Sequence, residues 1–212
     1  MNTEDLIEKM ASGLEPVAPL SSPGKRAAAW LLGAALYLGV LVLAMVLASG
    51  AAGAAGTSFW AAQAVAIAAG ALAGTAAFVS VVPGLANRLR WWAGAAFLVW
   101  LATLVAPPAA VDWSTVAAAN HEWVCAGFIV LGGAPLAAAL AWMLRRGAPL
   151  SPATTAALAA LAVATLANVG ACVSLPHENG AVTFVWHGGV VLAVVGVAAW
   201  SGRRVFSWPT RR

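Results

Sequence analysis

The chain has 212 residues, of which 62% are apolar and only 8% are charged, and its formal net charge is +4. A soluble domain carries about 25% charged residues, so this composition excludes a protein whose whole surface faces water. The positive charge does not indicate nucleic-acid binding, because basic clusters beside apolar runs set membrane orientation and contact anionic lipid. We therefore expect an integral membrane protein.

Six apolar runs of roughly 20 residues follow one another, and each is long enough to cross about 30 Å of hydrocarbon as a helix. We predict transmembrane helices over 27–49, 59–82, 91–107, 123–144, 153–175 and 182–201. Pro135 is expected to kink the fourth helix unless a neighbour satisfies the freed carbonyl group. The polar, acidic, proline-interrupted residues before the first run indicate a cytoplasmic tail and not a cleavable signal peptide.

The basic residues predict the topology, because Lys and Arg stay on the cytoplasmic side during insertion. All eleven can be placed inside if the chain crosses six times: Lys9, Lys25, Arg26, Arg88, Arg90, Arg145, Arg146, Arg203, Arg204, Arg211 and Arg212. The predicted fold is an all-α membrane protein, a six-transmembrane-helix bundle with cytoplasmic N- and C-termini. Its parts are a cytoplasmic tail (1–26), a transmembrane sensor domain (27–202) and a basic C-terminal tail (203–212).

Tryptophan positions agree with this layout, since indole rings favour the membrane interface. Those expected near inner ends are Trp30, Trp91, Trp92, Trp142 and Trp200, and those near outer ends are Trp60, Trp113, Trp123 and Trp186. Trp100 is the exception and is expected in mid-span.

The tail predicts a short amphipathic helix over 3–15, capped by Thr3. Its apolar stripe consists of Leu6, Ile7, Met10 and Leu14, and its acidic residues include Glu4, Asp5 and Glu8. Anionic lipid repels an acidic helix, whereas a protein groove with a basic rim suits one. The alternative is a disordered tail in which the spacing arose by chance.

Cys125 and Cys172 are expected at similar depth, within one or two turns of the outer interface. Two interpretations stay open from the residues alone. The cysteines act as small buried hydrophobic residues, or they form a thiol pair with a redox or metal-binding role. A disulfide needs Cα atoms within about 7 Å, which the sequence does not show.

Histidines and carboxylates gather at the same outer face, and thiolate with imidazole selects zinc or cadmium over hard cations. The candidate metal ligands are Cys125, Cys172, His187, His177, His121 and Glu122. No CxxC spacing is present, which disfavours a structural metal site or a thioredoxin-like motif. The alternative for the histidines and carboxylates is that they are solvated loop residues.

Gln63 and Asn168 are polar residues at membrane depth, and each predicts an interhelical hydrogen bond in preference to a transport role. No Asp, Glu, Lys or Arg lies deep inside a span, which disfavours a proton-coupled carrier. No phosphate-binding glycine loop or nucleophile elbow is present either.

Several stretches together resemble one family. They are Thr3–Ile7, Leu14–Val17, Leu144–Leu150, Phe184–His187, and the two cysteines Cys125 and Cys172. In this order and spacing they resemble the NrsF family of bacterial inner-membrane anti-sigma factors. The resemblance implies six spans, a cytoplasmic tail that binds an extracytoplasmic-function sigma factor, and sensing of metal or oxidative stress at the paired cysteines.

The predicted function is accordingly that of a regulator and not an enzyme: an anti-sigma factor of the bacterial inner membrane that requires no cofactor. A regulatory zinc- or cadmium-type ion at the cysteines is allowed, and no direct contact with nucleic acid is expected. The alternatives are a membrane thiol oxidoreductase coupled to quinone and a small metal carrier. Neither accounts for the acidic tail, and the oligomeric state stays open.

Overall fold

The computed structural model describes residues 2–12, 20–49, 56–85, 88–105, 122–147, 149–175 and 180–206. Every regular element within these ranges is helical, as predicted. The helices are α1 Thr3–Ala11, α2 Pro23–Ser49, α3 Thr57–Val79, α4 Leu89–Leu104, α5 Glu122–Gly127, α6 Gly133–Arg145, α7 Pro152–Ser174, α8 Gly180–Thr183 and α9 Gly189–Val205. Two π-helical turns, η3 Phe128–Gly132 and η4 Phe184–Gly188, join α5 to α6 and α8 to α9.

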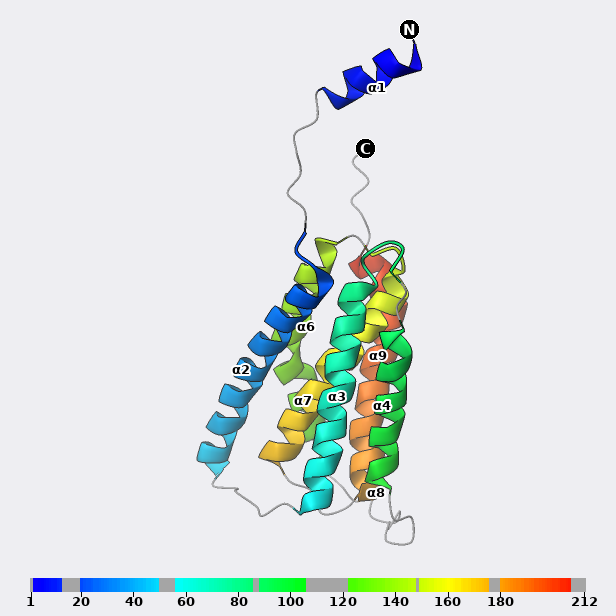
Figure 1. The fold of residues 1–212 in the computed structure, drawn as a ribbon. Coiled ribbons are helices and arrows are strands. Elements are labelled where there is room, and N and C mark those ends of the chain that lie inside the picture. Colours follow the sequence, from blue (N-terminus) through cyan, green and yellow to red (C-terminus); the bar gives the residue numbers. More distant parts are fainter. Residues whose placement is uncertain are drawn as a thin grey trace.

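Beyond α1, the described helices form six rods that run alternately in opposite directions along one bundle (Figure 1). Two of the rods are composite: α5–η3–α6 and α8–η4–α9. Five rods are long and apolar enough to cross a membrane. The sixth, α4, has 16 residues, so it extends only about 24 Å against a hydrocarbon thickness of about 30 Å. The helix predicted over 91–107 is α4, which begins two residues earlier than predicted and ends three residues earlier, at Leu104.

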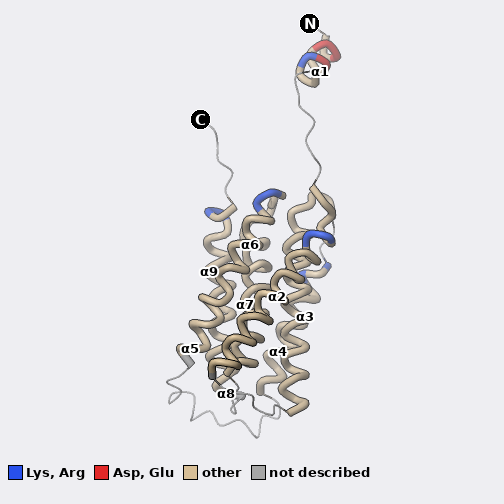
Figure 2. Tube along the Cα trace, turned by 90° about the vertical axis from the view of Figure 1, so that its left-hand side faces the viewer, with Lys and Arg blue, Asp and Glu red and all other residues tan. Residues whose placement is uncertain are grey.

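The basic residues of the described bundle lie at one end, where α2 begins and α9 finishes (Figure 2). Lys25 and Arg26 lie in the first turn of α2, Arg145 closes α6, and Arg203 and Arg204 lie in the last turn of α9. The positive-inside rule requires this grouping. We take this end as cytoplasmic in the proposals below.

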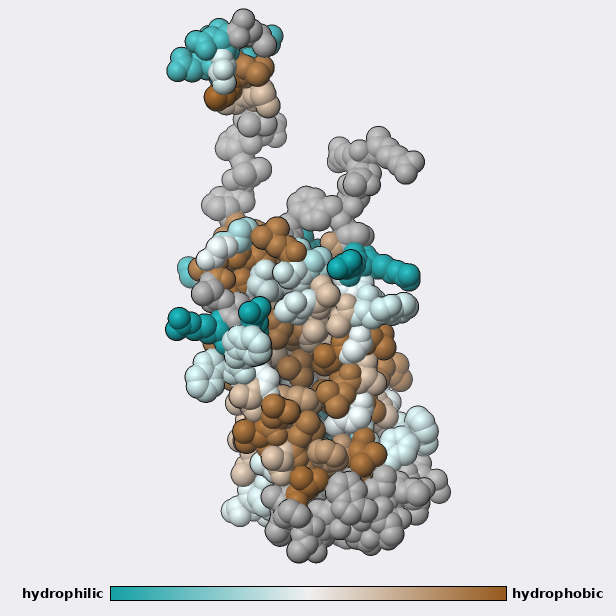
Figure 3. Space-filling model, turned by 90° about the vertical axis from the view of Figure 1, so that its right-hand side faces the viewer, coloured by the Kyte–Doolittle hydropathy of each residue, from teal (hydrophilic) through white to brown (hydrophobic). Residues whose placement is uncertain are grey.

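Aromatic rings accompany the arginines at this end. The guanidinium of Arg146 lies 3.9 Å from the centroid of the Trp142 ring, and that of Arg204 lies 5.3 Å from the Trp200 ring. Each of these cation–π contacts joins two residues that are four positions apart at the end of one rod. In Figure 3 hydrophilic side chains lie toward this end, and apolar side chains cover the middle of the face that would contact lipid.

Two tryptophans lie inside the bundle. Trp100 is fully buried, and the side chain of Trp30 is only 4% exposed. Trp30 lies near the start of α2, at the end of the span where it was predicted, but its ring faces the bundle. The Trp30 ring occupies the space left by Gly74, where an added Cβ would come within 2.9 Å of it. Its Nε1 donates to the carbonyl oxygen of Leu136 at 3.3 Å. Trp30 thus attaches the start of α2 to both α3 and α6.

α7 is the central helix and packs against α2, α3, α6 and α9. Small residues permit this close approach: a Cβ on Gly70 of α3 would come within 2.8 Å of both Leu166 and Thr165 of α7. The π turn η3 (Phe128–Gly132) ends three residues before Pro135, the residue at which a kink was predicted.

Candidate sensor site

Three buried polar side chains meet near the end of the bundle opposite the basic residues. The Nδ1 atom of His187 lies 2.6 Å from Asn168 Oδ1 and 3.4 Å from Cys172 Sγ. The thiol of Cys172 also donates to Asn168 Oδ1 at 3.8 Å. Asn168, Cys172 and His187 are 0%, 4% and 1% exposed. We refer to these three residues as the polar triad.

The secondary structure explains why the polar triad assembles. Asn168 and Cys172 are four residues apart on α7, so their side chains lie on the same face of that helix. His187 lies in the π turn η4, where the widened helix reorients the side chains of the sixth rod. α7 and α9 pack more extensively than any other pair of described helices, which holds η4 against α7.

The hydrogen bonds within the polar triad assign its protons. A carbonyl oxygen only accepts, so Nδ1 of His187 carries the proton that it donates to Asn168. The amide nitrogen Nδ2 of Asn168 has no hydrogen-bond partner among the described residues. A buried polar atom without a partner is uncommon in native proteins and marks this amide for a functional explanation.

Cys125 lies in α5 with a fully buried side chain. Both cysteines are thiols here. α5 packs against α7 and η4, and the rings of Trp123 and Trp186 meet edge to face with centroids 4.9 Å apart. The outer part of the fourth rod therefore lies beside the two segments that carry the polar triad.

The predicted metal ligands are only partly placed by the structure. Cys172 and His187 come together, whereas His121, His177 and the side chain of Glu122 lie outside the described residues. Within the part of the chain that the structure describes, no three His, Cys, Asp or Glu side chains are close enough to hold a metal ion.

Asn168 is the member of the polar triad that sequence reasoning did not assign to the site. The prediction that it forms an interhelical hydrogen bond is confirmed by its contact with His187. Gln63 is also buried, but its Oε1 has no partner in the described part of the chain. The available signal was the spacing: Asn168 precedes Cys172 by four residues, one helical turn.

The tail forms a helix, but the helix spans Thr3–Ala11 and ends earlier than the predicted range 3–15, and its N-cap is Asn2 and not Thr3. The Asn2 backbone is extended, and its N–H donates to the Asp5 carboxylate at 3.2 Å, which closes the first turn. No residue of α1 is buried, and Leu6, Ile7 and Met10 are 42%, 62% and 67% exposed. Leu14, the fourth predicted stripe residue, lies outside the described residues.

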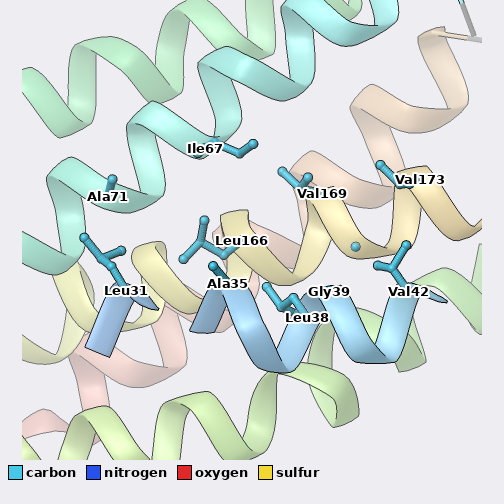
Figure 4. Close-up of a pocket in the computed structure, with 11 residues that line it drawn as sticks. Leu31, Ala35, Leu38, Gly39, Val42, Ile67, Ala71, Leu166, Val169 and Val173 are labelled. Carbon is cyan, nitrogen blue, oxygen red and sulfur yellow. The ribbon is translucent and has the colours of Figure 1, made fainter. Parts of the chain in front are cut away.

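The buried residues of α2, which follows the tail, lie in its first half, between Arg26 and Ala34, while Leu41 and Met45 further along are only partly buried against the bundle. Arg26 donates to the carbonyl oxygen of Met143 and lies over the Phe78 ring, with 5.1 Å from its guanidinium carbon to the ring centroid. Further along, α2 is separated from α3 and α7 by an apolar groove of about 440 Å³ (Figure 4). Its lining residues are Leu31, Ala35, Leu38, Gly39, Val42, Ile67, Ala71, Leu166, Val169, Gly170 and Val173.

Comparison with known proteins gives one family. Searches of curated proteins and of solved structures found no match. The family model described as NrsF, negative regulator of sigma F, matches residues 10–208, which include the groove, both cysteines and the polar triad. The chain therefore belongs to the NrsF family of negative regulators of sigma F.

Proposed function

We propose that this protein is an anti-sigma factor of the bacterial inner membrane that holds an extracytoplasmic-function sigma factor through its N-terminal tail. Metal or oxidative stress at Cys125 and Cys172, near the periplasmic face, releases the sigma factor. Family membership combined with a fully exposed amphipathic α1 joined to an apolar bundle supports this proposal. Residues 1–26 act as the sigma-binding tail, 27–202 as a six-span sensor and 203–212 as a basic cytoplasmic tail.

The chemistry of α1 suits a protein groove. Leu6, Ile7 and Met10 offer an apolar stripe with no cover within the described chain, while Glu4, Asp5 and Glu8 are acidic. Burying the stripe in a groove supplies binding energy, and the carboxylates cover basic surface of the sigma factor that would otherwise meet DNA or polymerase.

The tail contact is tested by purifying the tagged full-length protein in mild detergent from its native membrane and identifying co-purifying proteins by mass spectrometry. We expect a sigma factor with the wild type and at least about tenfold less with Met10→Glu, since a carboxylate in an apolar groove costs more than about 1.4 kcal/mol. Ser12→Glu adds the same charge two residues away, on the opposite face of the helix, and should retain the sigma factor.

Absence of a sigma factor from the wild type under reducing, metal-free conditions would contradict the proposal. If Met10→Glu and Ser12→Glu reduced the recovery of the sigma factor equally, the apolar stripe of α1 would not be the binding surface. In the first case the next assay would be quinone reduction by the two thiols.

The signal reaches the tail through α7 and α2. Val169, Gly170 and Val173 of α7 line the groove, and they alternate in sequence with Asn168 and Cys172 of the polar triad. The groove gives the outer part of α2 room to move, while Arg26 and Trp30 hold its inner end. A change at the cysteines thus tilts α2 about its inner end, and α2 continues into the tail. A tenfold rise in free sigma factor needs only about 1.4 kcal/mol of coupling.

Filling the groove should block this movement. Gly39 of α2 lines the groove, and a Cβ added there would have no atom within 4 Å, so Gly39→Leu adds apolar contacts between α2 and α7. We expect normal sigma binding and an induction ratio reduced about tenfold, measured with a sigma-dependent reporter. Gly33→Leu is the matched control, because Gly33 also has open space but does not line the groove. Equal induction in both variants would contradict the coupling route.

A further inference from the structure

We propose that Asn168, Cys172 and His187 together bind one soft divalent cation of the zinc or cadmium type, with the Asn168 amide oxygen as a ligand. The inference deepens the proposed sensing function and rests on it only for the regulatory consequence of binding. Of the predicted ligands, Cys172 and His187 are the two that lie in contact, and the Asn168 amide lies beside both of them.

The donor atoms have nearly the separations that a tetrahedral ion needs. With metal–sulfur and metal–nitrogen bonds of about 2.3 and 2.0 Å, the two donors of a tetrahedral site lie about 3.5 Å apart. Cys172 Sγ and His187 Nδ1 are 3.4 Å apart, and Cys172 Sγ and Asn168 Oδ1 are 3.8 Å apart. Only the 2.6 Å between His187 Nδ1 and Asn168 Oδ1 must widen, because those two atoms now share a proton.

The Asn168 amide can make this adjustment. Its Nδ2 has no hydrogen-bond partner in the described chain, so a small rotation of the side chain breaks no other bond. The movement required of Oδ1 is about 0.8 Å, if the oxygen is to sit about 3.4 Å from the imidazole nitrogen of a tetrahedral site. All three side chains are buried, so bulk water would not compete with them for their three positions on the cation.

The proton balance of binding is simple. The Cys172 thiol loses its proton to solvent and becomes a thiolate ligand, while the His187 proton moves from Nδ1 to Nε2 and the imidazole stays neutral. The cation thus releases one proton and gains one sulfur, one nitrogen and one oxygen donor, with a water as fourth ligand. Sulfur and imidazole nitrogen select zinc and cadmium over magnesium and calcium.

Binding of a cation to the polar triad would change the contact between the fifth and sixth rods. Two of its ligands lie on α7 and the third on the π turn η4, so the ion would cross-link the fifth and sixth rods. Asn168 is the immediate neighbour of Val169, which lines the groove against α2. If Asn168 and its neighbours on α7 move when the cation binds, Val169 moves with them and the shape of the groove changes directly.

The test is a titration of the purified full-length wild-type protein, the parent for all variants, with cadmium under reducing conditions. We expect one equivalent to bind with sulfur-to-cadmium charge-transfer absorption, which Cys172→Ser abolishes. Loss of a ligand should weaken binding at least about tenfold in His187→Gln and in Asn168→Ala. Asn168→Asp, which replaces the amide oxygen by a carboxylate, should bind more tightly than the parent.

Ser174→Ala is the matched control, since Ser174 is a fully buried polar residue of the same helix outside the polar triad, and its affinity should equal that of the parent. Thermal unfolding without metal shows that each variant is folded. The proposal is overturned by absence of binding in the wild-type protein, or by unchanged affinity in either His187→Gln or Asn168→Ala. If cadmium binding depended on the three residues of the polar triad but did not release a sigma factor, the metal site would stand and its sensing role would be contradicted.

Discussion

The Cys125→Ser, Cys172→Ser double variant is expected to bind the sigma factor as the wild type does. Its induction ratio with metal or oxidant should be at least about tenfold lower than that of the wild type. Both side chains are buried in the bundle, whereas α1 has no buried residue, so the exchange leaves the tail unchanged. Serine is close to cysteine in size but is neither a soft ligand nor oxidisable under these conditions. The protein therefore stays in its sigma-binding state.

The measurement pairs two readouts: recovery of the sigma factor with the tagged protein, and a sigma-dependent reporter before and after stress. The amount of each variant in the membrane is the control, since lower levels would raise the basal signal. Cys172→Ser alone should have the larger effect, because Cys172 contacts both His187 and Asn168. A double variant that responds like the wild type would end the sensing role of the cysteines.

Gly202→Leu is expected to destabilise the bundle by about 3 kcal/mol, the upper end for overpacking a close contact. A Cβ at Gly202 would come within 2.7 Å of the Pro152 carbonyl oxygen, 2.8 Å of the Ala156 Cβ and 3.0 Å of the Ala153 Cα. Two of these are backbone atoms, which no rotamer change moves aside. The substitution therefore separates α9 from α7, the most extensively packed pair.

Gly196→Leu is the matched control on the same helix, because no atom lies within 4 Å of a Cβ at Gly196. Its effect should stay within about 0.5 kcal/mol, as for an exposed site. Unfolding of both variants in detergent, followed by tryptophan fluorescence, measures the difference. Equal midpoints would show that the two rods do not meet at Gly202.

Most of the helical architecture was predictable from local properties. Helix ends lie within four residues of the predicted limits at both ends of all six rods, since hydropathy and backbone hydrogen bonding in lipid require helices there. The failures have local causes. The N-cap moved from Thr3 to Asn2 because Asp5 lies at the correct spacing to bond the Asn2 N–H. The orientation of the Trp30 ring toward the bundle was not predicted, because it depends on the space that Gly74 leaves on another helix.

The polar triad was predictable in part. Cys172 and His187 were both candidates because sulfur and imidazole are unusual in an apolar chain, and the structure brings them into contact. Asn168 was assigned an interhelical hydrogen bond but not a place beside a cysteine. Placing Asn168 beside Cys172 and His187 requires knowing which face of α7 meets the sixth rod. The π turn η4 shifts the helical register of that rod, and the spacing of apolar residues in the sequence does not predict such a turn.

Composition and charge alone thus determined that the chain is a bundle of apolar helices with its basic residues at one end, because lipid admits few other arrangements. The pattern of Leu6, Ile7 and Met10 likewise determined the exposed tail stripe. The tertiary structure decided what helical periodicity cannot encode: the assembly of Asn168, Cys172 and His187, and the groove beside α2. Both depend on the rotation and close approach of helices far apart in sequence, which small residues permit and side-chain packing selects.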